Sequence, residues 1–173
     1  MDRRGFAAKL AAMVMGVLAG LVPLGAGLAV FFDPLRRVGE SVRFHWVTTL
    51  SAVPEDGRPR RFAIVADRTD AWNKHRNVPV GAVYLRRVEG GKVEALNVTC
   101  PHAGCAVAYR VSSDSFLCPC HDSAFHLNGS LADPDSPSPR AMDALEVEVR
   151  HGQEVWVRYQ NFEPGKAQKV AVS

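Results

Sequence analysis

The sequence lacks several features that mark common classes of protein. It has no basic run interleaved with aromatic residues, and its formal net charge of +3 includes the arginines near the amino terminus, so no nucleic-acid partner is indicated. It has no heptad pattern and no internal repeat, which excludes a coiled coil and a repeat protein. Beyond the amino-terminal residues no amphipathic helix of any length stands out, so we do not expect helices to build the core.

Charge is absent from Leu10 to Phe32, a run of 23 residues. As a helix rising about 1.5 Å per residue, this run would be about 34 Å long, enough to cross a hydrocarbon core of about 30 Å. A cleavable secretory signal is the alternative, but its apolar region is usually only about 7 to 15 residues long. We therefore expect an uncleaved membrane anchor at residues 10–32, followed by a tether at 33–41.

Basic residues precede the anchor. Arg3, Arg4 and Lys9 favour a cytoplasmic location for residues 1–9 by the positive-inside rule. The stretch DRRGFAAK also resembles a twin-arginine export signal, although the arginines could be ordinary membrane-flanking cations. Both interpretations predict a single-pass protein of a bacterial inner membrane, in contact with lipid, with its head on the extracytoplasmic, periplasmic side.

Short β-prone runs, separated by turn signals, recur through residues 42–173. Turn signals such as PEDG at 54–57 and LNGS at 127–130 divide these runs. The pattern predicts an all-β domain with an antiparallel, sandwich-like or barrel-like fold, long enough to have its own core. The predicted strands are 42–49, 61–67, 80–88, 92–98, 106–111, 115–118, 145–150 and 154–159.

Cysteine is scarce and concentrated. All four cysteines lie in CPHAGC at 100–105 and CPCHDSAF at 118–125, together with two of the six histidines. Outside the cytoplasm they could form two disulfides, or two of them could join the histidines at a zinc ion. A third possibility is a [2Fe–2S] cluster in which two histidines replace two cysteines on one iron. This third arrangement gives a use to every one of these residues, whereas the zinc site, which would also leave two cysteines for a disulfide, would need an unusually tight C-x-H spacing.

The pattern C-x-H-x-G-C followed by C-x-C-H-x-S resembles that of Rieske [2Fe–2S] proteins, over most of residues 41–160. The resemblance implies an antiparallel β sandwich with a small cluster-binding subdomain at about 97–140. It implies one cluster, with a disulfide between Cys105 and Cys120 that ties the two loops together. The implied cluster ligands are Cys100, His102, Cys118 and His121.

Histidine ligation also implies a raised reduction potential. With two neutral imidazoles in place of two thiolates, the oxidised site carries no net charge and accepts an electron more readily, at about −150 to +300 mV. The electron's negative charge then favours protonation of His102 or His121. Uptake of an electron and a proton together suits the oxidation of a quinol.

Residues near the ligands resemble the family's tuning residues. Ser123 matches a serine whose hydroxyl donates to a bridging sulfide, and Phe125 stands where high-potential members carry a tyrosine. Asp122 stands where many members have glycine. The stretch PDSPSP at 134–139, which contains Pro137 and Pro139, resembles the proline-rich loop that covers the cluster. Loss of the tyrosine hydroxyl implies a lower potential, suited to menaquinol.

Three classes of protein share this cluster. Rieske oxygenases need a large second domain for which the chain has no room, and their cluster domains usually lack the extra cysteine pair. The favoured class is the iron–sulfur subunit of a respiratory cytochrome bc-type complex, a quinol–cytochrome c oxidoreductase. There His121 would meet quinol at a cytochrome b-type membrane subunit, and the head would pass the electron to a c-type cytochrome. The alternative is the Rieske small subunit of an arsenite-oxidase-like molybdoenzyme.

Overall fold

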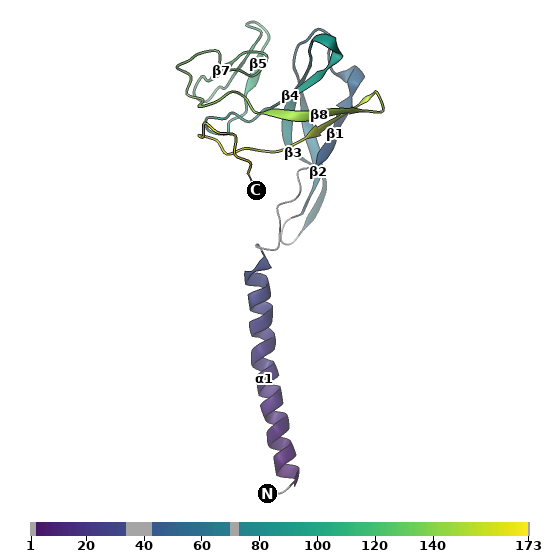
Figure 1. Ribbon diagram of the computed structural model, residues 1–173, viewed down its shortest axis with the longest axis vertical. Helices are drawn as coiled ribbons and strands as arrows, with labels where there is room; N and C mark the ends of the chain where they lie inside the picture. Colours follow the sequence, from purple (N-terminus) through teal and green to yellow (C-terminus); the bar gives the residue numbers. More distant parts are fainter. Residues whose placement is uncertain (1–2, 34–42, 70–72, 173) are drawn as a thin grey trace. The chain divides into compact units, whose positions relative to one another are not determined.

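The computed structural model describes residues 3–33, 43–69 and 73–172 (Figure 1). The chain divides into two compact units, residues 1–41 and 42–173. The first unit contains a helix and the second contains the β-strands. The predicted tether at 33–41 lies outside the described residues, except for Asp33.

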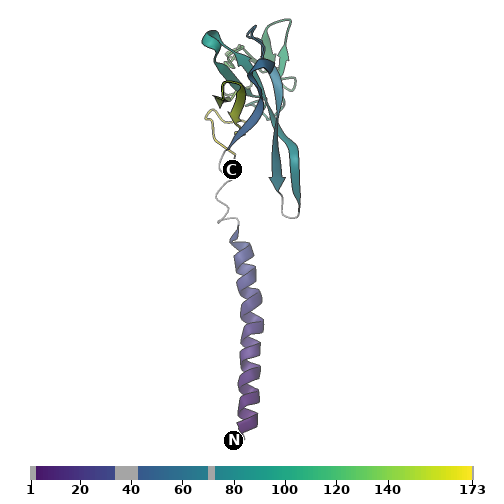
Figure 2. The same cartoon turned by 90° about the vertical axis from the view of Figure 1, so that its right-hand side faces the viewer.

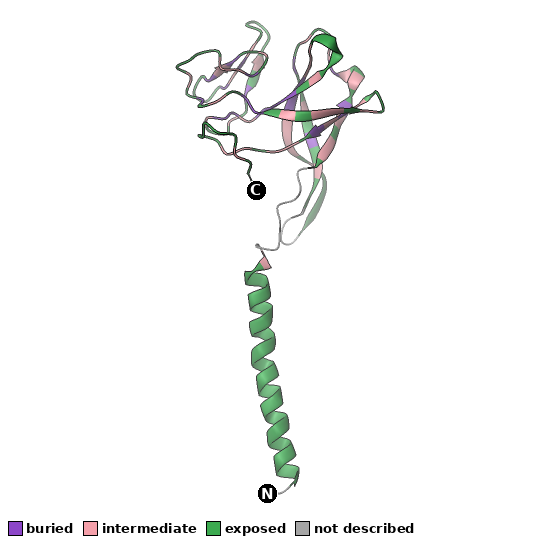
Figure 3. Ribbon diagram, viewed as in Figure 1, coloured by how far each residue is buried: buried purple, intermediate pink, exposed green. Residues whose placement is uncertain are grey.

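The amino-terminal helix, α1 (Arg3–Phe31), begins before the charge-free run and contains Pro23. It starts early because RRGFAAKL is rich in residues with good helix propensity, and a helix satisfies its own backbone whether or not lipid surrounds it. No residue of this helix is buried (Figure 3). Within the described residues it is the one helix long and apolar enough to cross a membrane, with a mean hydropathy of 2.2.

The second unit contains two antiparallel sheets. The larger sheet has the strand order β1-β9-β8-β4-β3-β2, and the smaller has the order β5-β6-β7. The strands are β1 (Phe44–Thr49), β2 (Arg60–Thr69), β3 (Lys74–Arg87), β4 (Val93–Asn97), β5 (Ala108–Arg110), β6 (Ser115–Leu117), β7 (Ala124–Phe125), β8 (Ala144–Arg150) and β9 (Glu154–Arg158). Two short 3-10 turns lie at Leu50–Ala52 and Glu89–Gly91.

The larger sheet curls toward a barrel, because β1 and β2, at the two ends of its strand order, also contact each other. Alternation along the strands fills its interior: Val155 and Val157 of β9 are fully buried, whereas Trp156 between them is not. This is the period of two expected of a half-buried strand. The prediction of an all-β antiparallel fold, preceded by one apolar helix, is confirmed.

The β2–β3 hairpin is longer than the alternation predicted (Figure 2). The predicted strand at 80–88 begins six residues earlier, at Lys74. Residues 74–77 are polar and exposed, Asn77 has a φ of 53°, and the register with β2 shifts twice. Such irregularities conceal a strand, because they break the alternation of polar and apolar residues. The two-residue strand β7 was also too short to be predicted.

Tyr84 joins the two sheets. Its ring lies in a buried cluster with Phe116 of β6 and Phe125 of β7. Its hydroxyl donates to the carbonyl of Val107 at 3.2 Å and accepts the backbone N–H of Tyr109 at 3.1 Å. One side chain of β3 therefore fixes both the packing of the small sheet and the position of β5.

We predict that Tyr84→Phe lowers the free energy of unfolding by about 1–3 kcal/mol, because it leaves a buried N–H and a buried carbonyl without a partner. Tyr109→Phe is the matched control. Its hydroxyl bonds Asp114 at the surface, so its loss should cost less than about 1 kcal/mol. Urea unfolding of the full chain in detergent measures both, and equal losses would contradict the role given to Tyr84.

Candidate metal centre

Two loops have similar backbone structures: one connects β4 of the larger sheet to β5 of the smaller sheet, and the other connects β6 to β7 within the smaller sheet. The first runs from Cys100 to Cys105, and the N–H of Cys100 donates to the carbonyl of Cys105 at 2.7 Å. The second runs from Cys118 to Ser123, and the N–H of Cys118 donates to the carbonyl of Ser123 at 2.9 Å. A backbone bond thus closes each loop across the same number of residues, with a cysteine at its start.

Each loop turns through a residue in the left-handed backbone region. Gly104 has a φ of 79°, and its N–H donates to the carbonyl of Cys100 at 2.9 Å. No atom lies near the position of a Cβ on Gly104, so glycine is required there for its conformation and not for space. Asp122 has a φ of 55° in the second loop. Asp tolerates this conformation better than most residues, so the second loop can turn here without a glycine.

The thiols of Cys100 and Cys118 are buried and not part of a disulfide. Burial raises the pKa of the Cys100 thiol, and its hydrogen bond and charge interaction with Cys118 raise it further, against a lowering contribution from the backbone of His102. Two buried thiolates so close together need a cation to compensate their charge. The pair could hold a metal ion, which would displace the thiol protons.

His102 and His121 face each other across the loops, with ring centroids 4.8 Å apart and ring planes at 76°. His102 is partly buried, whereas His121 is exposed. Nδ1 of His102 is buried and has no hydrogen-bond partner. A buried ring nitrogen without a partner is costly unless it binds something, so this atom could serve as a metal ligand.

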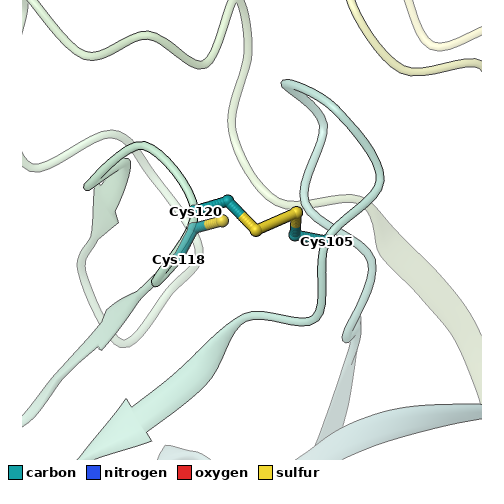
Figure 4. A group of neighbouring side chains, drawn as sticks. All are labelled: Cys105, Cys118 and Cys120. Atoms are coloured by element: carbon teal, nitrogen blue, oxygen red, sulfur yellow. A yellow bond between two sulfur atoms is a disulfide. The ribbon is translucent and has the colours of Figure 1, made fainter.

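A disulfide joins Cys105 and Cys120, fifteen residues apart (Figure 4). The sulfur of Cys118 lies within 4.8 Å of both disulfide sulfurs. These three sulfurs do not form a metal site by themselves, because a disulfide sulfur is not a thiolate. Of this group only Cys118 remains available, and its nearest thiol partner is Cys100 on the other loop.

The donor set fits a [2Fe–2S] cluster. It offers two buried thiols for one iron and two adjacent imidazoles for the other. Ser123 is fully buried, and its Oγ has no hydrogen-bond partner, so its hydroxyl hydrogen is available to a sulfide. Among the described residues three buried side-chain polar atoms lack a partner, and two of them, His102 Nδ1 and Ser123 Oγ, belong to these loops. Phe125 is fully buried in the same apolar cluster as Cys100 and Cys118.

The proline-rich loop at 134–139 is held by its polar residues. Ser138 is buried, and its hydroxyl donates to the carbonyl of Arg140 at 2.8 Å. Pro137 and Pro139 on either side of it are exposed. Their role as a cover for the cluster stays a prediction. Sequence reasoning missed Arg140 and the carboxyl-terminal residues to which it binds, because neither belongs to a metal-binding motif.

Comparison with known proteins identifies the family. The Rieske [2Fe-2S] domain matches residues 45–151, more than half of the chain. The chain therefore belongs to the Rieske [2Fe–2S] family, and its cofactor is a [2Fe–2S] cluster.

Several characterised proteins are similar to this chain in sequence or structure over more than half of its length. The menaquinol:cytochrome c reductase iron-sulfur subunit of Geobacillus thermodenitrificans is 29% identical over 124 residues, which cover 70% of each protein. The cytochrome b6-f complex iron-sulfur subunit of Chlorobaculum thiosulfatiphilum is 27% identical over 147 residues, 85% of this chain and 71% of that one. A plasma membrane Rieske protein of Synechocystis PCC 6803 has a similar structure with a TM-score of 0.44 and 22% identity, covering 64% of this chain and 96% of that one.

We predict that loss of the disulfide loosens both loops. A bridge that closes a loop of about 15 residues contributes about 3 kcal/mol in the chain-entropy account. Cys105→Ser, Cys120→Ser and the double variant should assemble the cluster poorly or lose it faster on warming. The decay of visible absorbance at a fixed temperature measures this loss. Mass mapping that finds Cys105 and Cys120 as free thiols in aerobically prepared protein would contradict the pairing.

Proposed function

We propose that the chain is the iron–sulfur subunit of a membrane-bound quinol–cytochrome c oxidoreductase complex. Its relatives include subunits of a menaquinol:cytochrome c reductase and of cytochrome b6-f complexes. The geometric observation that carries the proposal is the contrast between the two loops' donors: both thiols are buried, while the imidazole of His121 is exposed. A redox partner can therefore approach the centre through an imidazole.

The residues of the two loops take different roles in this proposal. Cys100 and Cys118 hold one iron, and His102 and His121 hold the other. When bound, the cluster supplies a one-electron couple. The ring of His121, which reaches the surface, is a hydrogen-bond partner for a quinol hydroxyl and orients the quinol at the centre.

The proposal also assigns a membrane anchor and an orientation to the amino-terminal residues. Residues 10–32, all but the last of which belong to α1, cross the membrane, and residues 33–41 tether the head to it. Arg3, Arg4 and Lys9 keep the amino terminus in the cytoplasm, so the head lies on the extracytoplasmic side. That compartment permits the disulfide between Cys105 and Cys120. The paired arginines also favour export by the twin-arginine route.

The proposed ligand assignment predicts that replacing any one of the four ligands abolishes the cluster. Cys100→Ser, His102→Ala, Cys118→Ser and His121→Ala should each abolish the electron paramagnetic resonance (EPR) signal of the reduced cluster, because each removes one of four required donors. His126→Ala is the matched control, since His126 is an exposed histidine close to the second loop in sequence. A variant at any of the four positions that keeps two irons and an unaltered signal would remove that residue from the ligand set.

The proteins that purify with the chain test whether it belongs to a quinol–cytochrome c oxidoreductase complex. We expect the full chain, extracted from membranes in mild detergent, to carry a b-type haem protein and to reduce cytochrome c when menaquinol is added. A subunit of an arsenite-oxidase-like enzyme would instead purify with a molybdoprotein and show no quinol-dependent reduction. That second outcome would overturn the proposal while leaving the cluster in place.

Phe125 and Ser123 lead to a prediction about the midpoint potential of the cluster, because a hydrogen bond to a cluster sulfur favours the reduced state. A hydrogen bond to a charged group contributes about 1.5–3 kcal/mol at most, which for a one-electron couple amounts to about 60–130 mV. Phe125 cannot donate one, so Phe125→Tyr should raise the midpoint potential by up to this amount if the hydroxyl reaches a sulfur. Ser123→Ala should lower it.

Protein-film voltammetry measures these midpoints. Phe62→Tyr is the control for an added hydroxyl, because Phe62 is partly buried and packs against the other apolar cluster, that of the larger sheet. Unchanged midpoints in both Phe125→Tyr and Ser123→Ala would show that these two positions do not tune the cluster.

A further inference from the structure

The carboxyl-terminal segment forms a hairpin that lies beyond the family match. Phe162 and Ala171 form an isolated antiparallel bridge, and backbone bonds join Glu163 to Val170 at 2.8 Å and Val172 to Asn161 at 2.9 Å. We call residues 161–172 the tail hairpin. The family match ends at residue 151, so the tail hairpin lies outside the matched residues.

The tail hairpin contacts the first cluster loop. The N–H of Gly165 donates to the carbonyl of Pro101 at 2.8 Å. Pro101 is fully buried and lies between Cys100 and His102. Gly165 has a φ of 74°, and a Cβ at this position would lie 3.7 Å from the carbonyl oxygen of His102. The turn of the hairpin therefore lies directly on the peptide groups on either side of His102.

Arg140 holds this turn in place. Its Nε and Nη2 donate to the two carboxylate oxygens of Asp143 at 3.0 and 2.8 Å. Its Nη1 donates to the carbonyl of Glu163 at 3.1 Å and to that of Lys166 at 2.5 Å. The side chains of Arg140 and Asp143 are only 9% and 5% exposed. The guanidinium thus binds backbone carbonyls of the tail hairpin on both sides of Gly165.

Asn97 also connects the region of the first cluster loop to the carboxyl-terminal segment. Its Nδ2 donates to the carbonyl of Gln160 at 3.0 Å, and its Oδ1 accepts the N–H of Thr99 at 2.9 Å. Asn97 is 1% exposed, and its own N–H donates to the carbonyl of Asp143. Nδ2 of Asn97 also donates to Oδ1 of Asn161 at 3.2 Å. Thr99 beside the first cluster loop, the Arg140–Asp143 pair and the start of the tail hairpin therefore share one partly buried hydrogen-bond network.

We propose that Arg140 is a positioning residue for the cluster, acting through the tail hairpin on the first cluster loop. A planar guanidinium bound to a carboxylate by two hydrogen bonds is rigid, and it makes few alternative contacts when buried. It keeps Gly165 against Pro101, which limits the movement of the peptide groups on either side of His102. This inference requires the cluster but does not depend on which quinol or cytochrome the chain serves.

The test compares Arg140→Lys with the double variant Arg140→Leu/Asp143→Leu. Lysine keeps a positive charge beside Asp143 but lacks the fork that reaches both tail carbonyls. The double variant removes the pair without leaving a buried charge alone, a change that cores often tolerate. In both we expect faster amide exchange at Gly165, an altered EPR spectrum of the reduced cluster, and cluster loss about tenfold faster, which corresponds to about 1.4 kcal/mol.

Arg86→Lys is the matched control. Arg86 is 16% exposed, and its Nε and Nη2 both bond Glu94, at 3.0 and 2.7 Å, between β3 and β4. This control should leave the EPR spectrum and the lifetime of the cluster unchanged. A wild-type spectrum and lifetime in the double variant, or an equal change in the control, would overturn the proposal. In the wild-type holo-protein, exchange at the Gly165 amide as fast as in an unstructured peptide would overturn it without any variant.

Discussion

A disulfide ties the two cluster loops together at one end of a β-hairpin. The first loop leads into β5 and the second follows β6, and these two strands pair, with Ala108 opposite Leu117. Each loop has its own backbone closure, so each is internally ordered. The distance between the loops depends on this strand pairing, on the disulfide and on the shared apolar cluster. The proposed four-donor site needs that distance to be constant, because each loop would supply one thiol and one imidazole.

The head contains two separate buried apolar clusters. One fills the curled larger sheet and contains Ile64, Leu85 and Val157. The other lies between the sheets, where Tyr84 and Phe116 pack in the same cluster as Cys100 and Cys118. The two free thiols, which the proposal assigns to iron, are therefore part of an apolar core. Burial in this core raises the pKa of the Cys100 thiol and favours a bound metal over a free thiolate.

Much of this organisation was predictable from the sequence, because its strongest signals are local. The spacing within CPHAGC and CPCHDSAF predicts the family, and alternation predicts most strands. The amino-terminal half of β3 was not predictable, since Asn77 and Pro79 interrupt its alternation. Arg140 was not predictable either. It looks like any loop arginine until the fold brings the carbonyls of Glu163 and Lys166 to its guanidinium.

The three sulfurs in Figure 4 carry a consequence for how such a centre is assembled. Thiol–disulfide exchange requires only a thiolate near a disulfide, and the sulfur of Cys118 lies within 4.8 Å of both Cys105 and Cys120. In the proposed ligand set iron binds Cys118, so the cofactor would occupy a thiolate that could otherwise attack the bridge. The metal would then act as a protecting group for the disulfide while the centre is assembled.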